Sequence, residues 1–312
     1  MHLLNKPTKI DFMRYRKVTG TTSVVLIVLS LIALFSFKLN FGIDFTGGTL
    51  VEIGYKKPAD LDKIRKALAE SGYKAKVNFY GRTTDVHIYI APNKEKTGQY
   101  KSATLLKILK EKTSKDVVLR RMEFVGSAVG DELTENGGLA LLTALFCILI
   151  YVALRFEYRF AVGSVAALVH DVMIILGIFA VTRIEFDLSV LAAVLAVIGY
   201  SLNDTIVVFD RIRENFRKIR KGDSVQVMNV SINETLSRTI MTSITTLLVL
   251  FALLMLGGEV IRGFSLALII GVLVGTYSSI FVASNVALQL GVSRDDMLEV
   301  KKEGADFEDG RP

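Results

Sequence analysis

The sequence has 312 residues, of which 51% are hydrophobic, and its formal net charge is +7. The hydrophobic residues fall in long runs, which excludes an ordinary soluble domain and indicates a membrane protein. No basic and aromatic nucleic-acid motif is present, so the charge points to membrane topology and anionic lipid. The single cysteine, Cys147, excludes an intramolecular disulfide and a metal site with cysteine spacing.

Six apolar segments predict six transmembrane helices. Each segment is near the length of about 20 residues that crosses a bilayer, and a helix satisfies its own backbone in lipid. The predicted spans are residues 20–37, 138–154, 160–182, 188–209, 239–256 and 264–290. Outside them lie an N-terminal segment 1–19, a basic loop 210–238 and a tail 291–312.

Lysine and arginine in the short connections predict the orientation, because cytoplasmic loops carry the excess of these residues. The two short loops on the opposite side hold only Arg183 and Arg262. Both termini and the basic loop are therefore expected in the cytoplasm. The basic residues on that side are Lys6, Lys9, Arg14, Arg16, Lys17, Arg155, Arg159, Arg211, Arg213, Arg217, Lys218, Arg220, Lys221, Arg294, Lys301 and Lys302.

The long segment 38–137 is then external, since long domains are exempt from the charge rule. Alternation of apolar and polar residues predicts strands, and helical periodicity predicts two helices. In chain order these are strand 49–55, helix 59–72, strands in "KVNFYG" and "DVHIYIA", helix 102–113 and strand 117–125. The order βαββαβ predicts a ferredoxin-like α+β domain, a fold that does not itself name a function.

An acidic residue interrupts the fourth predicted span. In "AVIGYSLNDTIVVFDRIREN" (196–215), Asn203 and Asp204 stand where lipid is expected. Asp204 lies about 10 Å from the cytoplasmic end of the span at Arg211. A charge at the centre of a span costs about 3 kcal/mol on insertion scales. Such a group pairs with another charge, stays protonated or lines water.

A partner for Asp204 is present at the start of the fifth span. Arg238 lies about 6 Å inside Glu234, at a depth similar to that of Asp204. Two interpretations stay open: a carboxylate whose protonation follows the helix arrangement, or a static ion pair that fixes helix register. Polar side chains near the pair that could line a track are Tyr200, Ser201, Thr242 and Thr245.

A second ionisable pair occurs in the third predicted span. His170 and Asp171 lie about 16–18 Å from Arg159, near the bilayer midplane. Histidine titrates near neutrality and suits a proton relay, whereas a simple hydrogen bond between the two side chains would serve helix packing. Gly271 and Gly275 form a GxxxG motif, which favours close helix approach.

Motifs for nucleotide or hydrolytic chemistry are absent from the sequence. It contains no GxxxxGK[ST] phosphate loop, no HExxH and no GxSxG with a matching partner arrangement. The protein is therefore expected not to be an enzyme and to need no cofactor. The membrane potential, worth about 2.3 kcal/mol per charge per 100 mV, is the expected source of energy for any work.

Several long motifs resemble the SecD/SecF family of protein-export proteins. "FGIDFTGGTLVEI" (41–53) is similar to the motif that follows the first span in both branches of the family. "RRMEFVGSAVGDEL", "RFEYRFAVGSVAALVHDV", "VIGYSLNDTIVVFDRIRENFRKIRKG" and "TLSRTIMTSITT" resemble the SecF branch. The resemblance covers nearly the whole chain, and it is weaker in the first dozen residues and after Val292.

This resemblance implies one six-span half of a twelve-span arrangement in the resistance-nodulation-division superfamily, with SecD as the other half. It implies a bacterial inner-membrane complex that assists the SecYEG translocon after the SecA motor has acted. The proton gradient would then help to complete preprotein movement. A small accessory subunit such as YajC is a further expected partner. The implied proton pathway consists of Asp204 and Arg238, and His170 and Asp171 lie in a motif similar to one of the family. The polar residues beside the pair, Asn203, Tyr200 and Thr242, are secondary candidates from the sequence itself.

Three alternatives remain from the residues alone. A proton-driven exporter of lipids or small molecules would share the superfamily and the charged pair. An intramembrane aspartyl protease would need Asp171 and Asp204 to share a proton, but such enzymes carry GxGD where this chain has "GYSLND". A passive translocon scaffold would use the buried charges only for structure.

Overall fold

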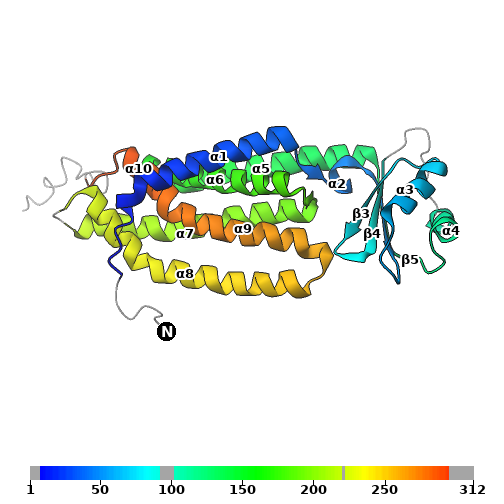
Figure 1. Cartoon of the computed structure of the whole chain (residues 1–312). Coiled ribbons are helices and arrows are strands. Elements are labelled where there is room, and N and C mark those ends of the chain that lie inside the picture. The colour runs from blue at the N-terminus through cyan, green and yellow to red at the C-terminus, as the bar shows by residue number, and fades with distance from the viewer. Residues whose placement is uncertain (1–7, 92–101, 220–221, 295–312) are drawn as a thin grey trace, which may run out of the picture.

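The computed structural model describes residues 8–91, 102–219 and 222–294. Its long helices form an elongated bundle, and a small β-sheet domain sits at one end of that bundle (Figure 1). The described start of the chain and helix α10 lie at the other end. Of the basic residues assigned to the cytoplasmic side, Lys6, Arg220, Lys221, Lys301 and Lys302 lie outside the described part, as does most of the predicted tail 291–312.

The six predicted spans are confirmed as helices long and apolar enough to cross a membrane. Five of them are α1 (Arg16–Phe37), α5 (Ser127–Arg155), α6 (Tyr158–Thr182), α7 (Leu188–Lys218) and α8 (Ser224–Leu256), and the sixth, Glu259–Gln289, is built around α9 (Arg262–Ser278). A π-helical turn, η3 (Ser279–Ala283), continues α9 into α10 (Ser284–Gln289). Short 3-10 turns, η1 (Met13–Tyr15) and η2 (Glu259–Ile261), precede α1 and α9.

The helices extend beyond the predicted apolar spans. Most of the predicted basic loop 210–238 is helical, because α7 ends only at Lys218 and α8 begins at Ser224. Hydropathy detects the part of a helix inside lipid, whereas charged residues continue the helix outside it. Glu214 supports this extension by pairing with Arg211 at 2.9 Å and with Lys218 at 2.5 Å, one turn away on either side.

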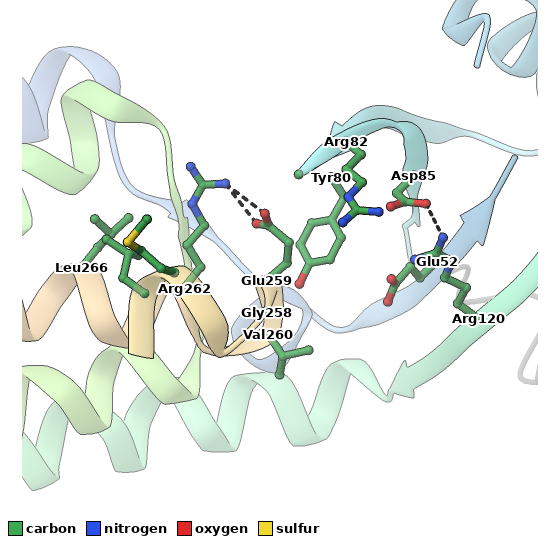
Figure 2. A pocket seen from close by; sticks show the side chains of 13 residues that line it. Glu52, Tyr80, Arg82, Asp85, Arg120, Gly258, Glu259, Val260, Arg262 and Leu266 are labelled. Carbon is green, nitrogen blue, oxygen red and sulfur yellow. Dashed lines mark hydrogen bonds and ion pairs between the residues drawn. The ribbon is translucent and has the colours of Figure 1, made fainter. Parts of the chain in front are cut away.

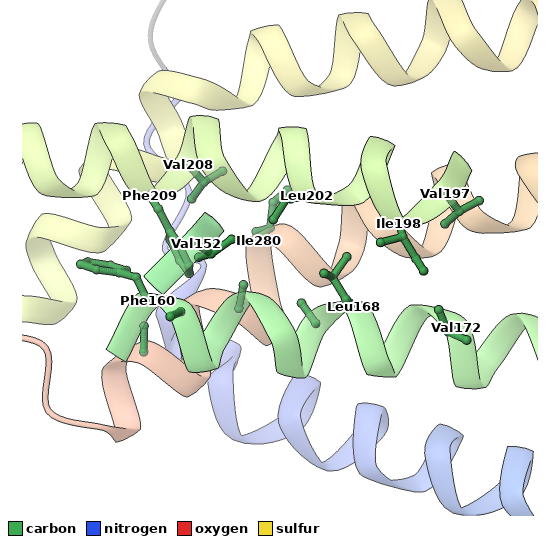
Figure 3. Close-up of a cluster of buried hydrophobic side chains, with 14 of the residues drawn as sticks. Val152, Phe160, Leu168, Val172, Val197, Ile198, Leu202, Val208, Phe209 and Ile280 are labelled. Carbon is green, nitrogen blue, oxygen red and sulfur yellow. The ribbon is translucent and has the colours of Figure 1, made fainter. Parts of the chain in front are cut away.

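Helices α6, α7 and α9 form the buried centre of the bundle. Between 50% and 56% of the most apolar window of these spans is buried, against 6–17% for α1, α5 and α8. The central core is a continuous set of apolar side chains, in which the rings of Phe160 and Phe209 lie 4.7 Å apart (Figure 3). The three outer helices leave large apolar surfaces for lipid or a partner's helices.

Two glycines bring α9 against α7. A Cβ atom at Gly271 would lie 2.1 Å from a methyl group of Val197, and one at Gly275 would lie 3.0 Å from the Cβ atom of Ser201. The GxxxG motif is therefore a close-packing site, as its spacing predicts. It also sets the rotation of the two helices, and so determines which polar residues of each helix meet.

The sheet domain has the predicted βαββαβ order. Its elements are β2 (Gly48–Gly54), α3 (Leu61–Glu70), β3 (Ala75–Tyr80), β4 (Arg82–Ile90), α4 (Ser102–Lys112) and β5 (Val118–Val125). The antiparallel strand order β3-β4-β2-β5 confirms the ferredoxin-like arrangement. The core of this domain includes Ile53, Val86, Ile88 and Leu109. Helices α3 and α4 lie on the side of the sheet away from the bundle (Figure 1).

The stretch "FGIDFTGG" forms the joint between bundle and sheet domain. It begins at the last residue of β1 (Asn40–Phe41), which pairs with β6 (Glu185–Phe186), and it contains the short helix α2 (Ile43–Thr46). Gly47 has φ of +65°, and a Cβ atom there would lie 2.8 Å from the Cα atom of Ser127 at the start of α5. Asp44 accepts a hydrogen bond of 3.0 Å from the amide of Leu188, at the start of α7. Only glycine allows this approach, so the motif ties the domain to two helices.

His87 on β4 is a pH-sensitive position in the sheet domain. Its ring stacks on Tyr80 with centroids 3.5 Å apart. Burial, together with the charge of Arg121, lowers the pKa of His87 to about 4. An unfolded chain would take up this proton near pH 6.5. The contribution of His87 to folding stability is therefore complete above pH 6.5, and it is lost as the pH falls toward 4.

We expect acidification from pH 7 to pH 4 to remove about 2 kcal/mol of sheet stability through this residue, a value discounted for the partial exposure of the ring. His87→Phe keeps a ring on Tyr80 but cannot titrate. This variant should therefore lose less sheet stability between pH 7 and pH 4. Hydrogen exchange of β3 and β4 in the full chain, compared between wild type and variant at each pH, measures the difference. Equal losses in the two proteins would contradict the assignment.

Candidate functional site

Asp204 lies on the buried face of α7, with 3% of the residue exposed. Its Oδ2 atom is enclosed and has no hydrogen-bond partner within the described residues. Most buried polar atoms in folded proteins do have a partner. The free oxygen therefore leaves room for a proton, a water molecule or a rearranged side chain at this position.

Arg238 lies on α8 and is exposed on the surface of the chain. Its positive charge acts electrostatically on Asp204. No salt bridge within 4 Å joins them, however, and in the described part of the chain Arg238 has no other ion-pair partner. The static ion pair considered from the sequence is thus not formed in this conformation.

The other predicted track residues divide into two groups. Thr242 donates to the carbonyls of Arg238 and Thr239 at 3.2 and 2.9 Å, so its hydroxyl bonds within its own helix. The hydroxyl of Tyr200 is buried and has no hydrogen-bond partner among the described residues. Asn203 is exposed, one residue from Asp204 but on the outer face of α7. Of these three, only Tyr200 presents a free buried polar atom.

Asp171 is the centre of a buried hydrogen-bond network at the midplane of the bundle. Its Oδ2 atom accepts from the hydroxyls of Ser201 at 2.6 Å and Ser278 at 2.7 Å. Its Oδ1 atom lies 2.9 Å from Nδ1 of His170. Asp171 and His170 are 1% and 0% exposed. The carboxylate thus joins α6, α7 and α9 at one depth.

Ser278 was not predicted, and Ser201 bonds to Asp171 rather than facing Asp204. The GxxxG motif is the sequence signal that could have identified Ser278. This serine follows Gly275 by one turn, on the helix that packs against Ser201. On the other side of His170, the ring of Tyr277 lies 6.0 Å away and its hydroxyl donates to the carbonyl of Thr19 on α1. Nε2 of His170 is buried without a partner in the described part of the structure. The network therefore reaches a fourth helix through an aromatic contact.

The geometry gives no support to an aspartyl protease. The oxygens of Asp171 are occupied by Ser201, Ser278 and His170, and no hydrogen bond joins Asp171 to Asp204 in the described structure. Groups of histidine, cysteine and acidic residues that could hold a metal ion are also absent from the described residues. What the arrangement can do chemically is bind or release a proton at Asp204 and change its attraction to Arg238.

Comparison with known protein families and relatives identifies the family of this chain. Residues 104–293 match the family described as protein export membrane protein SecD/SecF, C-terminal, and residues 32–59 match the SecD/SecF GG motif. The chain is 51% identical to protein translocase subunit SecF of Vibrio alginolyticus, with 98% of each chain covered. It is 46% identical to the subunit of the same name from Escherichia coli O157:H7, with 97% of this chain and 95% of the relative covered.

Solved structures of SecDF show the same fold. The crystal structure of SecDF from Thermus thermophilus, described as a translocon-associated membrane protein, superposes with a TM-score of 0.84 at 36% identity. A SecDF structure in a super-membrane-facing form gives a TM-score of 0.69 at the same identity. Each match covers 93% of this chain and 39% of the SecDF chain, so this chain corresponds to one part of the longer protein. The chain therefore belongs to the SecD/SecF family of protein export membrane proteins, as a member of its SecF branch.

Proposed function

We propose that this chain works with SecD beside the SecYEG translocon and uses the proton-motive force to help complete preprotein translocation across the bacterial inner membrane. The proposal includes no enzymatic step and no cofactor, because the energy comes from proton movement. The observation that carries it is Asp204, a buried carboxylate with a free oxygen, set near an arginine that has no salt bridge in the described structure.

The two charge states of Asp204 would favour different helix arrangements. An ionised carboxylate attracts the guanidinium of Arg238 and favours a shorter distance between α7 and α8. A protonated carboxyl group loses most of that attraction, and α8 is then free to separate. Binding and release of a proton would thus shift the population between two arrangements, with the difference in proton affinity setting the size of the shift.

SecD is the proposed partner that completes the membrane part. Family relatives called SecDF are longer chains, of which this chain matches 39%. The outer helices α1, α5 and α8 leave apolar surfaces that a second six-helix half or lipid would cover. Among the short connections and termini, those at the end opposite the sheet domain hold most of the lysine and arginine, which favours cytoplasmic termini and a periplasmic sheet domain. YajC would be an additional small subunit.

The test uses inverted membrane vesicles that contain this chain and its SecD partner. A preprotein is inserted by the ATP-driven motor and stopped as an intermediate, and completion is followed with the proton gradient intact or dissipated by an ionophore. We expect the gradient to speed completion only when this chain and SecD are both present. Equal rates with and without the gradient would overturn the proposal.

A further inference from the structure

The sheet domain touches the bundle at two separate places. One is the covalent joint, where the chain enters through "FGIDFTGG" and leaves into α5. The other is non-covalent: the tip of the β3–β4 hairpin at Gly81 meets Glu259, in the loop that joins α8 to α9 (Figure 2). A cavity of about 600 Å³ opens beside this second contact. The domain is thus tethered on one side and only docked on the other.

A glycine faces Glu259 across the docked contact. Gly81 has φ of +71°, and a Cβ atom there would lie 2.4 Å from Oε1 of Glu259 and 2.8 Å from its Cγ atom. Glu259 follows Gly258, which has φ of +78° and turns the chain at the end of α8. A methyl group at the hairpin tip would therefore displace the side chain of Glu259 from its place in the contact. The contact between Gly81 and Glu259 is close, and it is made by packing alone.

The ion pairs that form next to the contact each lie on one side of it. Glu259 accepts two hydrogen bonds of 3.1 Å from Arg262 on the loop side, and Asp85 pairs with Arg120 at 2.7 Å on the domain side (Figure 2). Within the described residues, no hydrogen bond or ion pair crosses from one side to the other. Separation of the two sides would therefore break no charged pair. This is the property expected of a contact that opens and closes.

The hairpin tip is held firmly on the domain side. Tyr80 stacks on His87, and burial with the charges of Glu52 and Glu259 raises the pKa of Tyr80 to about 12. The hydroxyl therefore stays neutral next to the carboxylates of the contact. On the bundle side, the same loop is the direct continuation of α8, the helix that carries Arg238.

We propose that the Gly81–Glu259 contact is a releasable latch through which movement of α8 reaches the sheet domain. The inference rests on the proposed proton-driven function and adds the part that transmits the motion, with Glu259 as a positioning residue. Relatives' structures differ in the region that this chain matches, since the two SecDF structures superpose on it with TM-scores of 0.84 and 0.69.

Gly81→Ala tests the latch, and Gly72→Ala is its matched control. Gly72 has φ of +80° and open space around its Cα atom, so both variants carry the same backbone strain but only Gly81→Ala pushes on Glu259. In a Cys147→Ser background, spin labels attached to Asn78→Cys and Leu256→Cys, both exposed positions, report the distance between domain and loop in the assembled complex. Completion of the preprotein intermediate is measured with and without the proton gradient.

We expect Gly81→Ala to lengthen the label distance and to reduce gradient stimulation about fivefold or more, the scale of a coupling between sites. Gly72→Ala should change neither, and adding Glu259→Ala to Gly81→Ala should restore the distance. The latch is overturned if Gly81→Ala matches Gly72→Ala, or if the distance changes and stimulation does not. Absence of stimulation in wild type would count against the proposed function, while the distances would still decide whether the contact forms.

Discussion

Asp204→Asn is expected to abolish stimulation by the proton gradient and to leave the complex assembled. Asparagine has the shape of aspartate but cannot gain or lose a proton at neutral pH, so the attraction to Arg238 becomes constant. Completion of the preprotein intermediate in vesicles should then proceed at the rate that wild type shows without a gradient. Arg238→Gln should have the same effect, because it removes the other charge of the pair.

Asp210→Asn is the control for this experiment. Asp210 lies on the same helix but pairs at 3.0 Å with Arg155 at the end of the bundle, where both side chains are partly exposed. Such a pair contributes about 1 kcal/mol at most, and gradient stimulation should persist without it.

Assembly of the variants separates the two interpretations of Asp204. A buried carboxylate without a fixed partner is not a net source of stability, so Asp204→Asn should be as stable as wild type or more stable. Reduced recovery of the complex with SecD would instead indicate a structural ion pair. Unchanged stimulation in Asp204→Asn would place the energy input elsewhere in the complex.

The fold was predictable because its signals are local. Span length identified the six helices, and alternation against helical periodicity identified the βαββαβ order of the sheet domain. The depth of Asp204 and Arg238 also followed from the helical rise alone. These features depend on residues within one segment, or on a distance measured along one helix axis.

Helix rotation and contacts between distant segments were not predictable in this way. Asn203 lies next to Asp204 in sequence yet points outward, and Ser278 became a partner of Asp171 because Gly275 packs on Ser201. Gly81 and Glu259 meet although 178 residues separate them in the sequence. Packing of whole helices and domains decides these contacts, and hydropathy carries no information about it.

Asp171→Ala is expected to lower the free energy of unfolding by about 3 kcal/mol, the larger of the stability effects predicted for this chain. The substitution removes three hydrogen bonds, and single bonds between membrane helices contribute about 0.6 to 1.7 kcal/mol each. It also leaves the hydroxyls of Ser201 and Ser278 buried without their acceptor. Unfolding by increasing fractions of a denaturing detergent in mixed micelles measures the change.

Ser243→Ala is the comparison for Asp171→Ala, because Ser243 makes one bond between helices, to Thr276 at 2.7 Å. Ser243→Ala should lower the free energy of unfolding by about 0.6 kcal/mol, the average for such bonds. If both variants lose the same free energy of unfolding, water replaces the partners of Asp171 and the network does not stabilise the helix packing. A much larger loss of stability for Asp171→Ala would mean that the network holds α6, α7 and α9 together. The displacement that Asp204 controls would then fall on α8, the helix that leads from Arg238 to Glu259.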